Sequence, residues 1–497
     1  MSTAQMPVPE RLMAFSKRLC KVAEDFEVLR LRLAPDDGSL PPAAPPKPPA
    51  PIEAGGAATV ERFKAMVGRL NEVTHQVQAL RVKLSAPLAA GEVQAPAQAA
   101  PAAVEAMETE EGAEEAEVPS YSIEKQGLET LPDDFPEAAK SFAVVNLASN
   151  KLTVLPPTSF ATLAAMLTDL NVSENLLTKI PDEISALKFL KVLDVSDNKL
   201  TAIPDCIGDL NMLERLDAYK NEITSLTPRI AELQNLLELN LFNNKLVQVP
   251  DGVSKLVSLH LLNIASNKLA SAPPLQDLSS LRRLALFWNK LTAISELGDK
   301  PFLEELQLSK NSLAALPDLS GLPSLTSLSA GDNKLEAIPP SISSCSSLQE
   351  LAVASNQISE FPPGISKLVA LTKVVASGNK ISELPAELFE LGTLETVDVA
   401  SNALEAVPDS FAALPALTNL FVQTNKITSL PASLRSLSLI KRITLTGNPI
   451  PTDTPEYLAL AEVLKATCEA NKGKFLGPEK PVAAAGGRKF NFGKLKA

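Results

Sequence analysis

An asparagine recurs at a nearly constant interval along the last two-thirds of this chain. The fourteen positions are Asn150, Asn175, Asn198, Asn221, Asn244, Asn267, Asn289, Asn311, Asn333, Asn356, Asn379, Asn402, Asn425 and Asn448. The first interval is 25 residues, the three intervals between Asn267 and Asn333 are 22 residues, and the others are 23 residues. A fixed period of this length indicates a solenoid, because each unit is one small element that buries its apolar face only against neighbouring units.

Aliphatic residues recur in register with these asparagines. Around Asn198 they include Leu190, Leu193, Val195 and Leu200. The general pattern is L-x-x-L-x-L-x-x-N-x-L-x-x-I/L-P-x-x-I-x-x-L. Alternation within L-x-L predicts a short half-buried strand in each unit, and successive strands are expected to stack into one parallel sheet. Each asparagine amide carries two donors and an acceptor that can pair with backbone groups of the turn between layers, so we interpret these asparagines as structural.

This pattern resembles the leucine-rich repeat family over roughly residues 121–470. The resemblance implies an α/β solenoid, a horseshoe whose parallel sheet lines the concave side. The 23-residue units with L-P-x-x-I resemble the intracellular Ras-group-related repeats of Ras-binding scaffolds and their plant counterparts, which implies a small GTPase as partner. The three 22-residue units resemble those of the protein phosphatase-1 regulator, which implies a phosphatase catalytic subunit.

Both ends of the repeat array, assigned to residues 119–449, are expected to be capped, because an open end would expose the core. At the N-terminal end a degraded repeat places Gly127 where the recurring asparagine would stand. At the other end a capping helix is expected over 450–470. Its predicted core-facing residues are Tyr457, Leu458, Ala461 and Leu464.

The last segment, residues 471–497, is expected to be a basic flexible tail. Residues 488–492 approximate a basic-aliphatic-x-aromatic phosphatase docking peptide, with Phe490 at the aliphatic position. The alternatives are nonspecific contact with acidic surfaces and no binding role.

The first 118 residues differ in composition from the repeats. Apolar residues at alternating spacings of three and four predict amphipathic helices over 1–34 and 59–85, joined by a proline-rich linker at 35–58. These helices either fold back on each other, self-associate with a second chain, or hold another protein. Residues 86–118 hold seven glutamates between 105 and 117 and no lysine or arginine, which predicts a disordered acidic linker.

The sequence offers little for catalysis or for binding a cofactor or a metal. It has no Gly-rich phosphate loop and no GxSxG motif. Its two histidines, His75 and His260, do not form a constellation with a cysteine, a serine or paired carboxylates in the sequence. We therefore predict that the protein is not an enzyme and has no catalytic, cofactor or metal site.

Cysteine usage and hydropathy bear on the compartment. The cysteines are Cys20, Cys206, Cys345 and Cys468. They are dispersed, whereas secreted leucine-rich repeat proteins usually carry paired cysteines in their caps, so the resemblance points to a reducing cytoplasm. The longest apolar runs are a few residues, far short of a membrane span. We predict a cytoplasmic protein without a membrane span and without nucleic acid as partner.

Bulky aromatic residues interrupt an otherwise small and polar concave face. The residues four and two positions before each recurring asparagine are expected to point out of that face. Tyr219, Phe242, Phe287 and Trp288, the only tryptophan, bring rings to neighbouring repeats, and Arg283 lies on one of the same strands. Aromatic residues with arginines are typical of binding hot spots. The alternative is packing between neighbouring rings without a partner.

These observations predict a non-enzymatic scaffold that binds a protein on the concave face of the solenoid. The predicted protein-binding residues are Tyr219, Phe242, Arg283, Phe287 and Trp288. The resemblance places this scaffold in small-GTPase signalling. The alternative is a regulatory or targeting subunit of a protein phosphatase.

Overall fold

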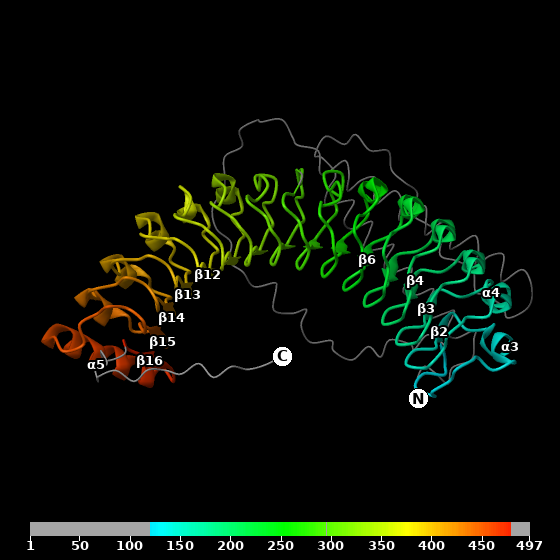
Figure 1. Cartoon of the computed structure of the whole chain (residues 1–497), viewed down its shortest axis with the longest axis horizontal. Helices are drawn as coiled ribbons and strands as arrows, with labels where there is room; N and C mark the ends of the chain where they lie inside the picture. Colours follow the sequence, from blue (N-terminus) through cyan, green and yellow to red (C-terminus); the bar gives the residue numbers. More distant parts are fainter. Residues whose placement is uncertain (1–119, 295, 479–497) are drawn as a thin grey trace, which may run out of the picture. The chain divides into compact units, whose positions relative to one another are not determined.

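The computed structural model describes residues 120–294 and 296–478, which form one parallel sheet of sixteen strands paired in chain order (Figure 1). Every strand is three residues long. The strands are β1 (Ser120–Ser122), β2 (Val144–Asn146), β3 (Asp169–Asn171), β4 (Val192–Asp194), β5 (Arg215–Asp217), β6 (Glu238–Asn240), β7 (Leu261–Asn263), β8 (Arg283–Ala285), β9 (Glu305–Gln307), β10 (Ser327–Ser329), β11 (Glu350–Ala352), β12 (Lys373–Val375), β13 (Thr396–Asp398), β14 (Asn419–Phe421), β15 (Arg442–Thr444) and β16 (Lys474–Leu476). The predicted solenoid with one parallel sheet is confirmed.

Short helices lie on the outer side of the sheet (Figure 1). They are α3 (Phe135–Ala139), α4 (Pro157–Leu163), and the 3₁₀ helices η2 (Asp182–Ala186), η3 (Asp205–Asp209), η4 (Pro228–Glu232), η5 (Asp251–Lys255), η6 (Pro340–Ser344), η7 (Ile365–Lys367), η8 (Ala386–Glu390), η9 (Asp409–Ala413) and η10 (Ala432–Ser436). Most of the 3₁₀ helices follow a proline, whose missing N–H costs nothing at a helix start. Between η5 and η6, where the 22-residue intervals fall, the described residues form turns instead.

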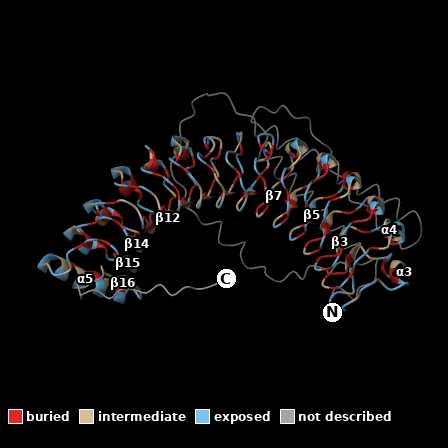
Figure 2. Cartoon of the chain, viewed as in Figure 1, coloured by how far each residue is buried: buried red, intermediate tan, exposed pale blue. Residues whose placement is uncertain are grey.

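The core is one continuous, mainly aliphatic cluster of buried residues, and buried positions run along the repeats of the solenoid (Figure 2). In β4 the side chain of Leu193 is buried while Val192 and Asp194 are partly exposed, and Val195 just beyond the strand is buried again. The predicted alternation is therefore confirmed.

The recurring asparagines, which we call the ladder asparagines, bond successive repeats together. The amide of Asn198 donates to the carbonyl oxygens of Val172 at 3.0 Å, Val195 at 3.1 Å and Ser196 at 3.0 Å. Its Oδ1 accepts the N–H of Leu177 at 2.9 Å. Closely similar contacts recur at the other ladder positions, which confirms the structural interpretation. A further constraint was not predicted: the residue before each ladder asparagine has a positive φ.

The two ends correct several expectations. Ser122 of β1 pairs with Asn146, an offset of 24 residues, so Gln126 rather than Gly127 takes the ladder position of the cap. At the other end, α5 (Pro455–Ala470) buries Leu460, Leu464 and Cys468. Leu458 is 54% exposed, so its predicted place on the core-facing side is wrong. The segment assigned to a flexible tail also contains β16, which pairs with β15.

The predicted helices at 1–34 and 59–85, the linkers at 35–58 and 86–118, and the tail from 479 onward, including the candidate docking peptide, lie outside the described residues. Within the described ranges, no helix combines the length and the hydropathy that crossing a bilayer requires.

Candidate protein-binding site on the concave face

The concave face is lined by side chains at fixed positions of each repeat. One such position, two residues before each ladder asparagine, we call the inner row. Its members are Ala148, Ser173, Ser196, Tyr219, Phe242, Ala265, Phe287, Ser309, Gly331, Ala354, Ser377, Ala400, Gln423 and Thr446. Because the residue directly before this position is buried in the core in every repeat, the side chain at this position points away from the core. Bulky rings therefore stand on an otherwise small and polar row.

Two of these rings meet although they are two repeats apart. The ring centroids of Phe242 and Phe287 lie 6.0 Å from each other in a tilted arrangement. Ala265, which separates them in the inner row, is fully buried. A methyl group between the two rings leaves room for them to lean together, and such a pair is a favourable aromatic arrangement. Both rings remain partly exposed.

Tyr219 and Trp288 extend this surface at its two ends. Tyr219 is partly exposed, and the ammonium of Lys220 lies 5.9 Å from its ring centroid. Trp288 is 53% exposed and lies against Lys310, whose ammonium is 4.9 Å from the ring centroid. We call Tyr219, Phe242, Phe287 and Trp288 the aromatic patch.

The backbone of Trp288 is in the left-handed region, with a φ of 55°. At the same position the other repeats carry Ser, Asp, Asn, Lys, Glu, Thr or Gly. A left-handed conformation costs an L-residue about 1–2 kcal/mol, and least for Gly, Asn and Asp. The ring is too exposed for burial in the core to offset that cost. Neither the fold nor the core therefore explains a tryptophan at this position.

The arginines beside the patch are already paired. Arg283 lies 3.4 Å from Glu305, and Arg282 donates to Glu304 at 3.0 Å. Arg215 donates to Asp217 and lies 3.5 Å from Glu238. The sequence predicts Arg283 as a contact to a partner but does not predict its ion pair with Glu305 of the next repeat. Aligning the two 22-residue units would have revealed Glu305 at the matching position.

An unpredicted polar row supports the backbone beneath the rings. Six successive repeats carry Asn or Asp four residues before the ladder asparagine: Asn146, Asn171, Asp194, Asp217, Asn240 and Asn263. The Oδ1 of Asn240 accepts the N–H of Phe242 at 3.3 Å, and Asn263 accepts that of Ala265 at 3.2 Å. Burial raises the pKa of Asp194 above its ordinary value, while hydrogen bonds from Ser196 oppose the shift and the nearby Asp217 adds to it. These side chains accept hydrogen bonds from the backbone N–H groups of the inner-row residues, so we interpret this polar row as structural.

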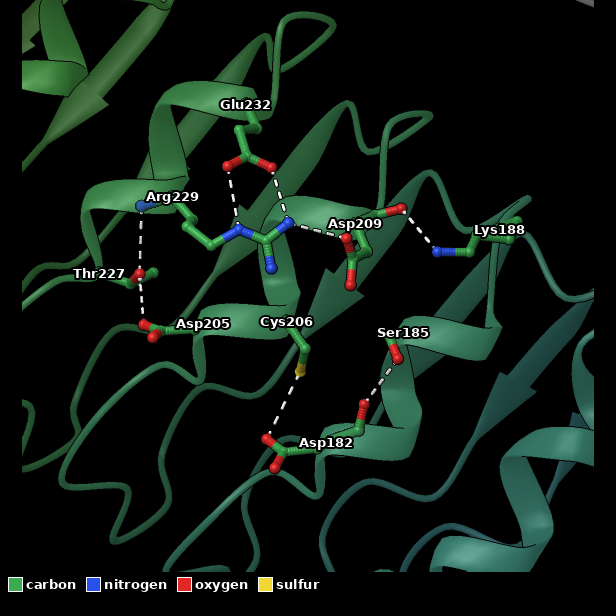
Figure 3. Close-up of polar contacts among 9 residues, drawn as sticks. All are labelled: Asp182, Ser185, Lys188, Asp205, Cys206, Asp209, Thr227, Arg229 and Glu232. Atoms are coloured by element: carbon green, nitrogen blue, oxygen red, sulfur yellow. Dashed lines mark hydrogen bonds and ion pairs between the residues drawn. The ribbon is translucent and has the colours of Figure 1, made fainter.

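The outer face carries a second polar network, between η2, η3 and η4 (Figure 3). Arg229 of η4 donates to Glu232 at 2.9 and 2.8 Å and to Asp209 of η3 at 2.8 Å. The thiol of Cys206 lies 3.7 Å from Asp182, and burial, reinforced by this carboxylate, raises its pKa to about 11. A thiol with so high a pKa is a poor nucleophile at neutral pH. The network joins adjacent outer arms and has no feature of a reactive site.

Family models and solved structures of known proteins match this architecture. A model described as "Leucine-rich repeat region" matches residues 196–373, and one described as "Leucine rich repeat" matches 165–223, 369–427 and 392–450. A leucine-rich repeat protein of Leptospira interrogans is 30% identical, with a TM-score of 0.59 over 71% of this chain and 94% of that chain. The chain belongs to the leucine-rich repeat family.

Other leucine-rich repeat structures share the fold at lower identity. A TDR receptor is 25% identical, with a TM-score of 0.55 over 67% of this chain and 68% of that chain. The plant peptide hormone receptor RGFR1, solved in complex with RGF2, is 23% identical, with a TM-score of 0.51 over 70% of this chain and 65% of that chain. A search among curated proteins gives no match.

Proposed function

We propose that this leucine-rich repeat protein is a non-enzymatic scaffold that binds a protein partner at the aromatic patch of its concave face. The observation that carries the proposal is Trp288. A large ring occupies a left-handed position, remains 53% exposed, and serves no core. Its conformational cost is offset if a partner covers the ring.

The energetics of the patch support the same conclusion. Large aromatic rings contribute most where a partner removes them from water, and truncation at such hot spots costs about 2–4 kcal/mol of binding free energy. The contact between Phe242 and Phe287 fixes both rings before binding. Less side-chain entropy is then lost when a partner docks. Arg283, held by Glu305, contributes at the border of the surface.

The class of partner follows from the resemblance of the repeats. The 23-residue units favour a small GTPase, and the 22-residue units favour a phosphatase catalytic subunit as the alternative. The patch lies where the two kinds of unit meet, because Phe242 belongs to a 23-residue interval and Phe287 to the first 22-residue interval. We also propose a reducing compartment such as the cytoplasm, because Cys206, Cys345 and Cys468 are free thiols.

Affinity capture with the full chain tests the proposal. We expect Phe287→Ala/Trp288→Ala to retain its circular dichroism and melting temperature and to lose the main partner that the wild type captures. The matched control is Phe421→Ala, which removes a partly exposed ring of β14 on the same face, far from the patch. If the double variant folds normally and keeps every partner, the proposed site is wrong. A marked fall in its melting temperature would show that the rings are structural.

A further inference from the structure

A row of lysines borders the aromatic patch on one side. In eight repeats the residue directly after the ladder asparagine is an exposed lysine: Lys151, Lys199, Lys245, Lys268, Lys290, Lys334, Lys380 and Lys426. The backbone N–H groups of Lys245, Lys268 and Lys290 donate to Ile223, Leu246 and Leu269 of the preceding repeats at 2.9, 2.8 and 2.9 Å. These bonds hold consecutive members in register. We call this set the lysine row.

Beside the aromatic patch, successive repeats each contribute a lysine to the row, and few acidic residues lie near these lysines. Lys245, Lys268 and Lys290 follow the ladder asparagines of three successive repeats. The stretches 244–250, 267–273 and 289–294 contain no aspartate or glutamate. Among the described residues, the ion pairs of this row are limited to Lys245 with Glu222 at 2.7 Å. Lys310 adds a further cation, directly against Trp288.

On the opposite border of the patch, the positive charges are paired with carboxylates. There the arginines Arg215, Arg282 and Arg283 each lie within ion-pair distance of a carboxylate. The aromatic patch therefore has one neutral, ion-paired border and one cationic border. A partner that fits both must present apolar surface flanked, on one side, by negative charge.

We propose that the partner is an acidic protein segment whose carboxylates lie against Lys268, Lys290 and Lys310 while an apolar side chain packs on Phe242, Phe287 and Trp288. This inference rests on the proposed function and specifies the chemistry of its ligand. Carboxylates beside exposed lysines steer association and fix orientation, with a strength that falls as salt rises.

A protein segment fits better than a nucleic acid. Proteins that bind single-stranded nucleic acid track its backbone with a positively charged groove, whereas Leu176, Glu222, Ser312, Gln357 and Ala403 interrupt the lysine row. Paired carboxylates also stand along the other border of the patch. The cationic surface is local to the aromatic rings, which suits a short segment.

Selection of peptides tests this proposal on the full chain. A random dodecapeptide library displayed on phage is selected on the wild type, with counter-selection on Phe287→Ala/Trp288→Ala. We expect the retained sequences to combine aspartate or glutamate with a large apolar residue. A synthetic copy, free of tryptophan, is then titrated while the emission of Trp288, the only tryptophan, is followed.

Charge reversal supplies the matched comparison. Lys268→Glu/Lys290→Glu is expected to weaken peptide binding at least about tenfold, and added salt to weaken wild-type binding. Lys380→Glu/Lys426→Glu, in the same row but distant from the patch, is expected to leave it unchanged. Equal weakening by the distant pair would overturn the proposal. Selection of neutral or basic peptides would do so as well.

Two further outcomes separate the inference from the function on which it rests. If no peptide distinguishes the wild type from Phe287→Ala/Trp288→Ala, the inference fails, and the proposed function fails as well only if affinity capture with the same variant keeps every partner. If peptides do distinguish them but are not acidic, the function stands and only the inference fails. Binding of single-stranded oligothymidylate that is lost in Lys268→Glu/Lys290→Glu, without acidic peptides, would overturn the inference in favour of a nucleic acid.

Discussion

The repeats of β5–β8 and those of β10–β13 share a backbone and differ in the surface that they present. Asn244 in the first group donates to the carbonyls of Ala218 and Leu241, and Asn356 in the second donates to the equivalent Ala330 and Val353, at closely similar distances. On the inner row, however, the first group carries Tyr219, Phe242 and Phe287, whereas the second carries Gly331, Ala354, Ser377 and Ala400.

The fold therefore constrains the residues of the core and the ladder asparagines but leaves the choice of inner-row residues free. A small residue and a ring are equally compatible with the same hydrogen bonds, because the side chain points away from them. We therefore propose that the rings in one group serve binding and not folding. Three predictions test this separation.

The largest effect is expected from the ladder itself. Asn244→Ala and Asn356→Ala each leave buried backbone groups without partners, at about 1–3 kcal/mol per group. We therefore expect each variant to lose on the order of 3 kcal/mol of stability, by equal amounts in the two groups. Chemical denaturation followed by circular dichroism measures the loss. A much smaller loss at Asn244 would mean that the aromatic rings brace their own repeats, which would contradict the separation.

Lys300 is a charged residue at a core position that is aliphatic in the adjacent repeats, and the second prediction concerns this residue. It occupies the position that Leu278 and Leu322 hold in the adjacent repeats, is fully buried, and donates to the carbonyl of Leu275 at 2.8 Å. Burial lowers the pKa of Lys300 to about 8 from an ordinary value of 10.5. We expect Lys300→Leu to complete the aliphatic column and raise stability at neutral pH by about 2–3 kcal/mol.

The pH dependence of the Lys300 effect has a definite sign. Between about pH 8 and 10.5 the unfolded chain keeps a proton on Lys300 that the folded chain has released. The unfolded state then binds more protons, so this group makes stability rise with pH across that window. The advantage of Lys300→Leu over the wild type should therefore shrink above pH 8. Thermal melts of both proteins at several pH values measure the difference. A constant difference would contradict burial of a charged amine.

The sequence predicts the repeats, the strand positions, the core and the role of the ladder asparagines. It does so because each of these depends on a period that every unit repeats. The exposed rings Phe287 and Trp288 could be assigned to the concave face for the same reason.

What the sequence did not predict depends on contacts that the period leaves open. The pairing of Arg283 with Glu305 requires the register between neighbouring repeats. The orientation of α5, which exposes Leu458, depends on the open end of the core that the helix covers and not on its own spacing. The left-handed backbone of Trp288 results from the ladder turn and is invisible in composition.

The smallest effect on stability is expected at Trp288, and it separates binding from folding most sharply. Asn243 holds the same left-handed position in the β6 repeat, so asparagine is known to fit there. We expect Trp288→Asn to gain about 1 kcal/mol, because asparagine tolerates a positive φ better than tryptophan.

The reverse substitution, Asn243→Trp, is the matched control and should lose a similar amount. Chemical denaturation followed by circular dichroism measures both changes. The wild type and the Trp288→Asn protein, which contains no tryptophan, are also titrated with the selected acidic peptide by isothermal titration calorimetry. We expect it to be more stable than the wild type and to bind the peptide more weakly. A variant that gains stability while binding is lost identifies Trp288 as a residue retained for its partner at the expense of the fold. If Trp288→Asn instead loses stability, the ring contributes to folding through Lys310, and the two groups of repeats differ in more than their surfaces.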